Sequence, residues 1–154
     1  MDYTWYPAYD RIVSQIDELL AKEKNRPVTV AIDGMCGSGK STLGQALKDH
    51  YGCNLFHMDD FYLRMEQRTP ERYAEPGGNV DYERFQAEVL KQLENKDGFS
   101  YQLFSCATFS LSDFVAVSWN RLNIVEGSYS QNPYFGDIYD LRLFCRIGTE
   151  EQLQ

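Results

Sequence analysis

Residues 28–42 read Val28-Thr29-Val30-Ala31-Ile32-Asp33-Gly34-Met35-Cys36-Gly37-Ser38-Gly39-Lys40-Ser41-Thr42, and this stretch decides the fold. Its first five residues are nearly all apolar and rich in β-branched side chains, which is typical of a strand covered on both faces in a parallel sheet. The pattern breaks at Asp33-Gly34, and Leu43, Ala46 and Leu47 then predict a helix toward Tyr51 that ends at Gly52. The stretch therefore predicts a central strand, a glycine-rich loop and a helix in direct succession.

The glycine-rich loop matches the pattern G-x-x-x-x-G-K-S/T. Its glycines allow successive N–H groups to point at a phosphate, and the following helix adds its positive end. Lys40 supplies a mobile cation, and Ser41 offers a hydroxyl to Mg²⁺. The alternative, a turn that merely caps a helix, is disfavoured because a strand and a helix flank the motif on the required sides. The predicted triphosphate-binding residues are Gly34, Gly37, Ser38, Gly39, Lys40, Ser41 and Thr42.

The rest of the chain alternates helices and strands. Apolar spacing predicts helices over residues 10–24 and from 81 to about 96, and strands over 53–58, 99–111 (one or two), 122–125 and 139–147. A long loop with little periodicity covers residues 59–80, and loops of that length inside a domain are usually functional. We therefore expect an α/β fold of the P-loop NTPase type, with three layers and a mainly parallel central sheet.

Composition excludes several classes of protein. The chain has 154 residues, 43% hydrophobic and 25% charged, with a net charge of -8, which excludes a disordered chain and argues against sequence-independent nucleic-acid binding. No apolar run approaches the roughly 18 residues that span a bilayer, and the start lacks a signal-peptide pattern, so we expect a cytoplasmic protein. Four cysteines without a C-x-x-C pair predict reduced thiols and no zinc site.

The absence of two motifs argues against a GTPase and against a motor ATPase. The stretch Asn95-Lys96-Asp97-Gly98 has its aspartate one place too early to be the guanine-reading N-K-x-D motif, and Val125 stands where a motor ATPase would carry an aspartate before Glu126. Small-molecule phosphotransfer remains. Asp59 and Asp60, at the end of a predicted strand, can supply the carboxylate that such a reaction needs, although either can also cap a turn.

Five motifs in order resemble the uridine kinase and phosphoribulokinase family of P-loop kinases, across nearly the whole chain after the first helix. They are residues 34–42, His57-Met58-Asp59-Asp60-Phe61-Tyr62, residues 77–85, residues 124–129 and residues 139–144. The resemblance implies that Asp59 is the catalytic carboxylate beside Lys40. It also implies that Asp81 holds sugar hydroxyls, that Tyr62 and Tyr101 line the substrate pocket, and that Glu126 acts with Ser41 and Asp59 at magnesium.

Several of these residues have structural alternatives. Asp81 stands where a helix N-cap is expected, and Glu126 can be a surface charge at a strand end. The arginines Arg64, Arg68, Arg72 and Arg84 can meet an anionic acceptor, with Arg84 the candidate substrate contact, or each can be a solvated surface charge. The aromatic residues Phe104, Phe109 and Phe114 are expected in the core rather than on a base-stacking platform.

The sequence departs from the family pattern twice. Cys106 occupies the position of a base-reading histidine and is a much weaker hydrogen-bonding group. The sequence ends at Gln154, just after a capping-box pattern at residues 149–152, where the family continues into an arginine-bearing lid. We therefore expect one domain, with a helix in 1–27 and a kinase-like domain over 28–154 that ends before the lid helix. Such a form is expected to bind nucleotide and to transfer phosphate poorly unless a partner subunit supplies arginines.

The leading hypothesis is an ATP- and Mg²⁺-dependent phosphotransferase that acts on a hydroxyl of a small metabolite, such as the nucleosides uridine or cytidine. The alternatives are a non-catalytic nucleotide-binding regulator, or degenerate kinase, and a P-loop ATPase that serves a protein partner. Nucleic acid and membrane are not expected as partners, and a homo-oligomer stays open.

Overall fold

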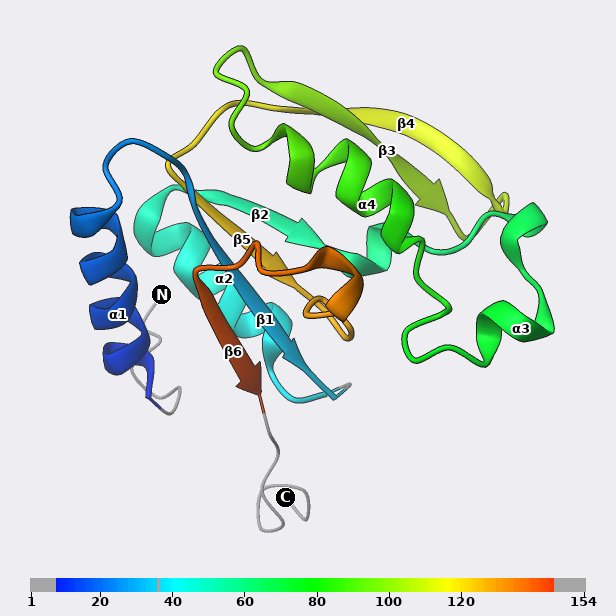
Figure 1. The fold of residues 1–154 in the computed structure, drawn as a ribbon, viewed down its shortest axis with the longest axis horizontal. Coiled ribbons are helices and arrows are strands. Elements are labelled where there is room, and N and C mark those ends of the chain that lie inside the picture. The colour runs from blue at the N-terminus through cyan, green and yellow to red at the C-terminus, as the bar shows by residue number, and fades with distance from the viewer. Residues whose placement is uncertain (1–7, 36, 146–154) are drawn as a thin grey trace, which may run out of the picture.

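The computed structural model describes residues 8–35 and 37–145, and a four-stranded parallel sheet lies at its centre (Figure 1). The strand order is β2 (Asn54–His57), β5 (Leu122–Glu126), β1 (Val28–Gly34) and β6 (Leu141–Cys145). Val30 pairs with Ile124 on one side and with Leu141 on the other. The prediction that residues 28–32 form a central strand is confirmed, and their continuous burial explains the apolar run.

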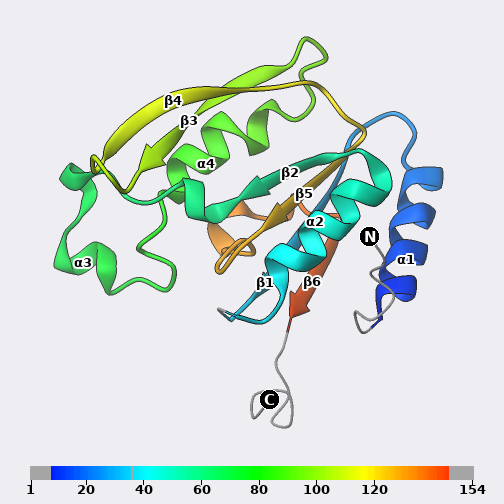
Figure 2. The same ribbon diagram turned by 180° about the vertical axis from the view of Figure 1, so that it is seen from behind.

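Helices cover one face of this sheet. The helices α1 (Tyr9–Lys22) and α2 (Lys40–Tyr51) lie against it, and Figure 2 shows both on the same side. Ile16 of α1 and Leu47 of α2 are fully buried with alternate residues of β1. Gly52 ends α2 in the left-handed conformation and donates to the carbonyl of Lys48, as the sequence predicts.

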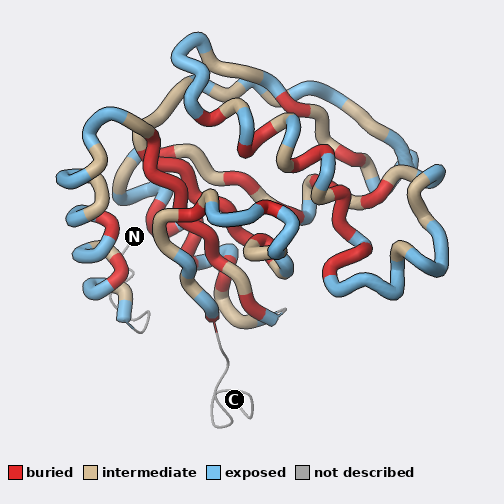
Figure 3. The backbone as a smooth tube through the Cα atoms, viewed as in Figure 1, coloured by how far each residue is buried: buried red, intermediate tan, exposed pale blue. Residues whose placement is uncertain are grey.

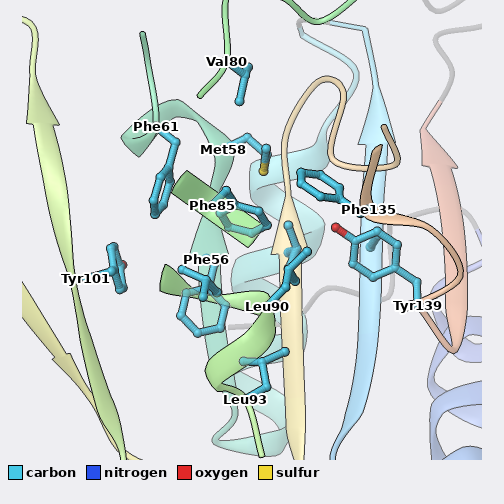
Figure 4. Packing of buried hydrophobic residues seen from close by; sticks show 13 residues of the cluster. Phe56, Met58, Phe61, Val80, Phe85, Leu90, Leu93, Tyr101, Phe135 and Tyr139 are labelled. Carbon is cyan, nitrogen blue, oxygen red and sulfur yellow. The ribbon is translucent and has the colours of Figure 1, made fainter. Parts of the chain in front are cut away.

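The opposite face carries α4 (Tyr82–Glu88), a 3₁₀ turn (Leu90–Gln92) and a hairpin of β3 (Phe99–Ser105) and β4 (Ser110–Val117). Its core is rich in aromatic residues (Figure 4). The ring of Phe61 lies 5.0 Å from that of Phe85 and 5.4 Å from that of Tyr101, measured between centroids. Buried residues concentrate in the central strands and around this cluster, whereas exposed residues concentrate in the outer loops and along much of α1 (Figure 3). The three-layer expectation is therefore confirmed.

The strands expected within residues 99–111 are confirmed with a different extent, whereas two other expectations about the outer layer are wrong. The strands predicted within 99–111 form an antiparallel hairpin in a sheet of its own, and its second strand continues to Val117. Helix α4 ends at Glu88 rather than near residue 96. Phe109 and Phe114 are 55% and 67% exposed, because they lie in the hairpin's turn and in β4 at the edge of the molecule; Phe104 alone of that group is in the core.

The predicted long loop contains short helical segments: the 3₁₀ turns Met58–Asp60 and Met65–Gln67, and α3 (Pro70–Tyr73). A further 3₁₀ turn covers Pro133–Phe135. The capping-box pattern at residues 149–152 lies outside the described residues. Within the described residues, no helix has the length and apolar character needed to cross a lipid bilayer.

Candidate functional site

The glycine-rich loop joins the end of β1 to the start of α2, where parallel sheets present their ligand sites. Gly34 has a φ of 144°, and a Cβ on it would lie 2.4 Å from the carbonyl oxygen of Cys145, so only glycine fits there. Gly37 and Gly39 also have positive φ, and Gly39 caps α2. Lys40 is buried and its Nζ donates to the carbonyl of Met35 at 2.7 Å, so its ammonium group folds back along the loop.

The buried hydroxyl of Ser38 has no hydrogen-bond partner among the residues that the structure describes. A buried hydroxyl without a partner is costly, and a phosphate oxygen would satisfy it. Thr42, the last of the predicted loop residues, lies in the first turn of α2 and is exposed. The seven residues predicted to bind the triphosphate thus lie at the end of β1, in the loop and in the first turn of α2. Together with positions 35 and 36 they form one continuous stretch of the chain.

A short hydrogen-bonded chain crosses from α2 to β5 and β2. Ser41 Oγ donates to Glu126 Oε1 at 2.9 Å, and His57 Nδ1 lies 3.0 Å from the same oxygen. Burial alone would raise the pKa of Glu126, but the hydrogen bonds from His57 and Ser41 and the charge of Lys40 bring this pKa below its ordinary value. The hydrogen bond to Glu126 raises the pKa of His57 in turn.

Two of the predicted magnesium ligands, Ser41 and Glu126, are thus in direct contact. A hydroxyl and a carboxylate suit Mg²⁺, which keeps several waters and usually takes only one or two protein carboxylates. The residues present therefore fit such an ion. Within the described residues, no group of three or more His, Cys, Asp or Glu side chains is placed to hold a metal by itself. No contact joins Asp59 to this pair among the interactions of the described residues.

The predicted acceptor carboxylates lie in the 3₁₀ turn that follows β2. Because His57 pairs with Glu126 across β2 and β5, this turn begins beside the Ser41–Glu126 pair. Asp59 is exposed and accepts a hydrogen bond from the hydroxyl of Tyr62 at 3.3 Å. Asp60 is half-buried, and burial raises its pKa, as do the charges of Asp59 and Glu126, against the opposing effect of His57.

Asp81 is the N-cap of α4, so the structural alternative raised for it is confirmed. Its Oδ1 accepts from the backbone N–H of Arg84 and from Gln67 Nε2, each at 3.2 Å. Its Oδ2 lies 3.5 Å from Arg64 Nε and 3.4 Å from Arg84 Nε but has no hydrogen bond. The Asp81 side chain is completely buried, so a ligand can reach it only if the segment that carries Arg64 and Gln67 moves.

Arg84 and Tyr101, two of the predicted substrate residues, are also buried. The Arg84 guanidinium lies 4.6 Å above the Phe61 ring and donates to the carbonyl of Gln102 at 2.8 Å and to Glu88. Burial, together with a smaller effect of the charge of Asp60, raises the pKa of Tyr101 to about 12. Among the predicted substrate residues, Tyr62 is the one only partly buried, and it bridges to Val80.

The picture of the arginines as solvated surface charges is wrong for Arg72 and Arg84. Arg72 pairs with Glu83 at 2.7 Å, and its guanidinium lies 3.9 Å from the centroid of the Tyr82 ring. Arg68 lies 5.7 Å from the ring centroids of both Phe104 and Phe109. Stacking on aromatic rings holds these side chains against the protein.

Asp33 is a further residue of this site that the sequence motifs did not identify. Its carboxylate accepts three backbone hydrogen bonds: from Gly34 at 2.7 Å, from Tyr129 at 2.9 Å and from Gln131 at 3.0 Å. The signal available in the sequence was an acidic residue directly before the glycine loop. Two of its three partners, Tyr129 and Gln131, lie almost a hundred positions away, so the spacing alone could not identify this role.

One pocket of about 500 Å³ lies away from these groups. Its lining includes Arg26, Thr29, Leu90 and Lys91. Thr29 lies at the start of β1, whereas the glycine loop follows the end of that strand. This pocket is therefore separate from the candidate site.

Comparison with known proteins finds distant relatives among uridine kinases. Uridine kinases of Bacillus thuringiensis strain Al Hakam and Bacillus cereus strain B4264 are each 25% identical to the chain over 142 residues. Each alignment covers 84% of this chain and 64% of the relative, so the chain spans less than two thirds of the length of these curated relatives. No protein-family model matches the sequence.

Two solved structures have a similar fold. A protein described as a possible uridine kinase from Bacillus stearothermophilus has a TM-score of 0.69 and 23% identity, with 88% of this chain and 79% of that chain covered. A protein provisionally assigned as a fructose transport system kinase from Silicibacter sp. TM1040 also has a TM-score of 0.69 and 23% identity, with 93% and 76% covered.

Proposed function

Because the chain is a distant homologue of uridine kinases over most of its length, we propose that it is a phosphotransferase that uses ATP and Mg²⁺. Its acceptor is the hydroxyl of a small metabolite, and a nucleoside such as uridine or cytidine is the first choice. The observation that carries this proposal is the adjacency of β2 and β5. Their pairing sets the acceptor turn, Met58–Asp60, next to the Ser41–Glu126 pair at the end of the glycine loop.

On the nucleotide side, residues 34–42 cradle the phosphates through backbone N–H groups of the loop and of the first turn of α2, except that of Gly34, which donates to Asp33. Lys40 turns from Met35 toward the β- and γ-phosphates. Ser41 Oγ and Glu126 hold the Mg²⁺ site, Glu126 directly or through a water. The ion supplies neutralisation of the phosphate charge when it is bound. His57 keeps the Glu126 carboxylate oriented toward Ser41.

On the acceptor side, Asp59 orients the hydroxyl and accepts its proton as the oxygen attacks the γ-phosphorus and the bond to the β-phosphate oxygen breaks. Tyr62 donates to Asp59 and so fixes the direction of this carboxylate. Since the transition state of phosphoryl transfer is loose, these residues act mainly by positioning and by stabilising charge. Asp81 holds acceptor hydroxyls once the Arg64–Gln67 segment has opened.

Two substitutions test this assignment with different expected signatures. Asp59→Asn is expected to lower kcat for uridine by about 10²–10⁴, the usual contribution of a general base, and to leave ATP binding nearly unchanged. Lys40→Ala is expected to weaken ATP binding and transfer together. Asp113→Asn, an exposed aspartate of β4, is the matched control. Equal turnover by Asp59→Asn and the parent protein would refute the role of Asp59.

A second function, nucleotide binding without transfer, is favoured by the closed state of the acceptor side. Asp81 is completely buried, and the exposed Cys106 replaces the histidine that reads the base in the family that the sequence resembles. A thermal-shift screen with MgATP and a panel of nucleosides and sugars separates the candidates, because a ligand of the folded state raises the melting temperature. Stabilisation by MgATP without turnover on any acceptor would favour a regulator. Hydrolysis of ATP without an acceptor would favour an ATPase.

A further inference from the structure

Tyr129, in the turn after β5, has an unusual backbone conformation. Its φ is 66°, in the left-handed region that bulky side chains rarely adopt. Its side chain is 46% exposed, so burial of its ring does not account for the conformation. A residue keeps such a conformation only where its surroundings impose it, and these positions cluster at functional sites.

The backbone of Tyr129 is tied to the start of the glycine loop. Its N–H donates to Asp33 Oδ1 at 2.9 Å, and the same oxygen accepts from the N–H of Gly34 at 2.7 Å. The preceding residue, Ser128, donates its hydroxyl to the carbonyl of Gly34 at 2.9 Å. These hydrogen bonds tie the turn to the first residue of the glycine loop.

The side chain of Tyr129 lies against Gly77, in the segment that leads to the acceptor side. A Cβ on Gly77 would lie 2.7 Å from Tyr129 Cγ and 2.9 Å from Tyr129 Cβ, so the contact is possible only with glycine at this position. The carbonyl of Gly77 accepts from the N–H of Val80 at 3.1 Å, and Val80 bridges to Tyr62. Asp81 follows directly.

We propose that Tyr129 is a positioning residue that couples the glycine loop to the acceptor segment 77–81. The position of its backbone depends on the positions of Asp33 and Gly34. The position of its ring in turn affects Gly77, which the ring contacts directly. Its catalytic consequence, correct placement of Tyr62 and Asp81 when nucleotide fills the loop, rests on the proposed function. The coupling itself does not depend on the proposed function, because it consists only of contacts between residues of this chain.

Three variants separate positioning from simple stabilisation. Tyr129→Gly removes the ring and also relieves the left-handed backbone, so it should not lower the melting temperature. Tyr129→Phe keeps the ring and should behave like the parent protein. Tyr73→Ala, which removes another exposed tyrosine from the neighbouring α3, is the matched control.

Hydrogen–deuterium exchange measures the coupling without any acceptor. The amides of Val80 and Asp81, bonded to Gly77 and Phe61, should exchange faster in Tyr129→Gly than in the parent, the Phe variant and the Tyr73 control. MgATP should slow their exchange in the parent and not in Tyr129→Gly. Exchange at these amides that is the same in Tyr129→Gly and the parent, with or without MgATP, would overturn the inference.

Steady-state kinetics with uridine and MgATP test the consequence. Tyr129→Gly should raise KM for uridine about tenfold, since small misplacements of reacting groups have large effects, and should change KM for ATP less than about twofold. Equal rises in both KM values with a lowered melting temperature would show a merely structural role and overturn the inference. If the parent transfers no phosphate, the proposed function fails, and the exchange experiment still decides the coupling.

Discussion

Replacing Asp33 by asparagine tests how the turn after β5 is attached to the central strand. The Asp33 carboxylate accepts three backbone hydrogen bonds, two on Oδ1 and one on Oδ2, at 2.7 to 3.0 Å. Asparagine has nearly the same shape but only one acceptor oxygen. In either orientation of the amide, its NH₂ group faces at least one backbone N–H donor.

The cost follows from these contacts. Hydrogen bonds to a charged group contribute about 1.5–3 kcal/mol and neutral ones about 0.5–1.5 kcal/mol, while a donor left without an acceptor costs about 1–3 kcal/mol. Because Asp33 is only half-buried, solvent offsets part of this loss. We expect Asp33→Asn to lower the free energy of unfolding by about 2–4 kcal/mol in total. For a domain of this size that corresponds to a fall in Tm of roughly 5–15 °C.

Urea denaturation followed by circular dichroism gives the required free energies. Asp113→Asn is the control, because Asp113 is exposed in β4 and substitutions at such positions usually change stability by less than about 0.5 kcal/mol. The m-values of the two variants must agree for the comparison to hold. If the two variants unfold at the same urea concentration, the three hydrogen bonds of Asp33 do not contribute about 2–4 kcal/mol to stability.

Three further predictions concern the magnesium pair and the core. Glu126→Gln should raise the Mg²⁺ concentration needed for ATP binding by about 10–100-fold in calorimetry, and an unchanged requirement would remove Glu126 from the site. An NMR titration of the metal-free protein should give His57 a pKa above its ordinary value, and Glu126→Gln should lower it. The stabilisation from His57 should therefore be complete below about pH 6.5 and fade as the pH rises through the folded-state pKa; the opposite trend would contradict the assignment. Phe85→Ala should cost about 3–5 kcal/mol of unfolding free energy, whereas Phe114→Ala, at a 67% exposed position, should cost little; similar losses would contradict the packing described.

Much of the central layer could be predicted because its signals are local. The apolar run of residues 28–32 requires burial on both faces, and Gly52 supplies the left-handed residue that ends α2. The outer layer was harder to predict from the sequence. The strands of the hairpin pair with each other, and nothing in their own residues distinguishes this pairing from addition to the main sheet.

The residues of the candidate site likewise fall into those that could be identified from the sequence and those that only the structure placed. The glycine loop was recognisable because its chemistry lies in consecutive residues. The family resemblance named Glu126 as a partner of Ser41 at magnesium, and their side chains are in contact at 2.9 Å. The burial of Asp81 and Arg84 was not predictable, because it depends on how the segment 64–68 and the hairpin pack over α4.

By itself, the sequence determined that a strand, an anion-binding loop and a helix follow one another. In that stretch, the backbone conformation and the burial of each residue depend on residues close to it along the chain. Only the tertiary structure decided that Asp33 holds the turn of Tyr129, and that the ring of Tyr129 lies on Gly77. The physical reason is distance along the chain. The strand order β2-β5-β1-β6 brings together segments that are far apart in sequence, and contacts between such segments leave no periodic pattern in either one.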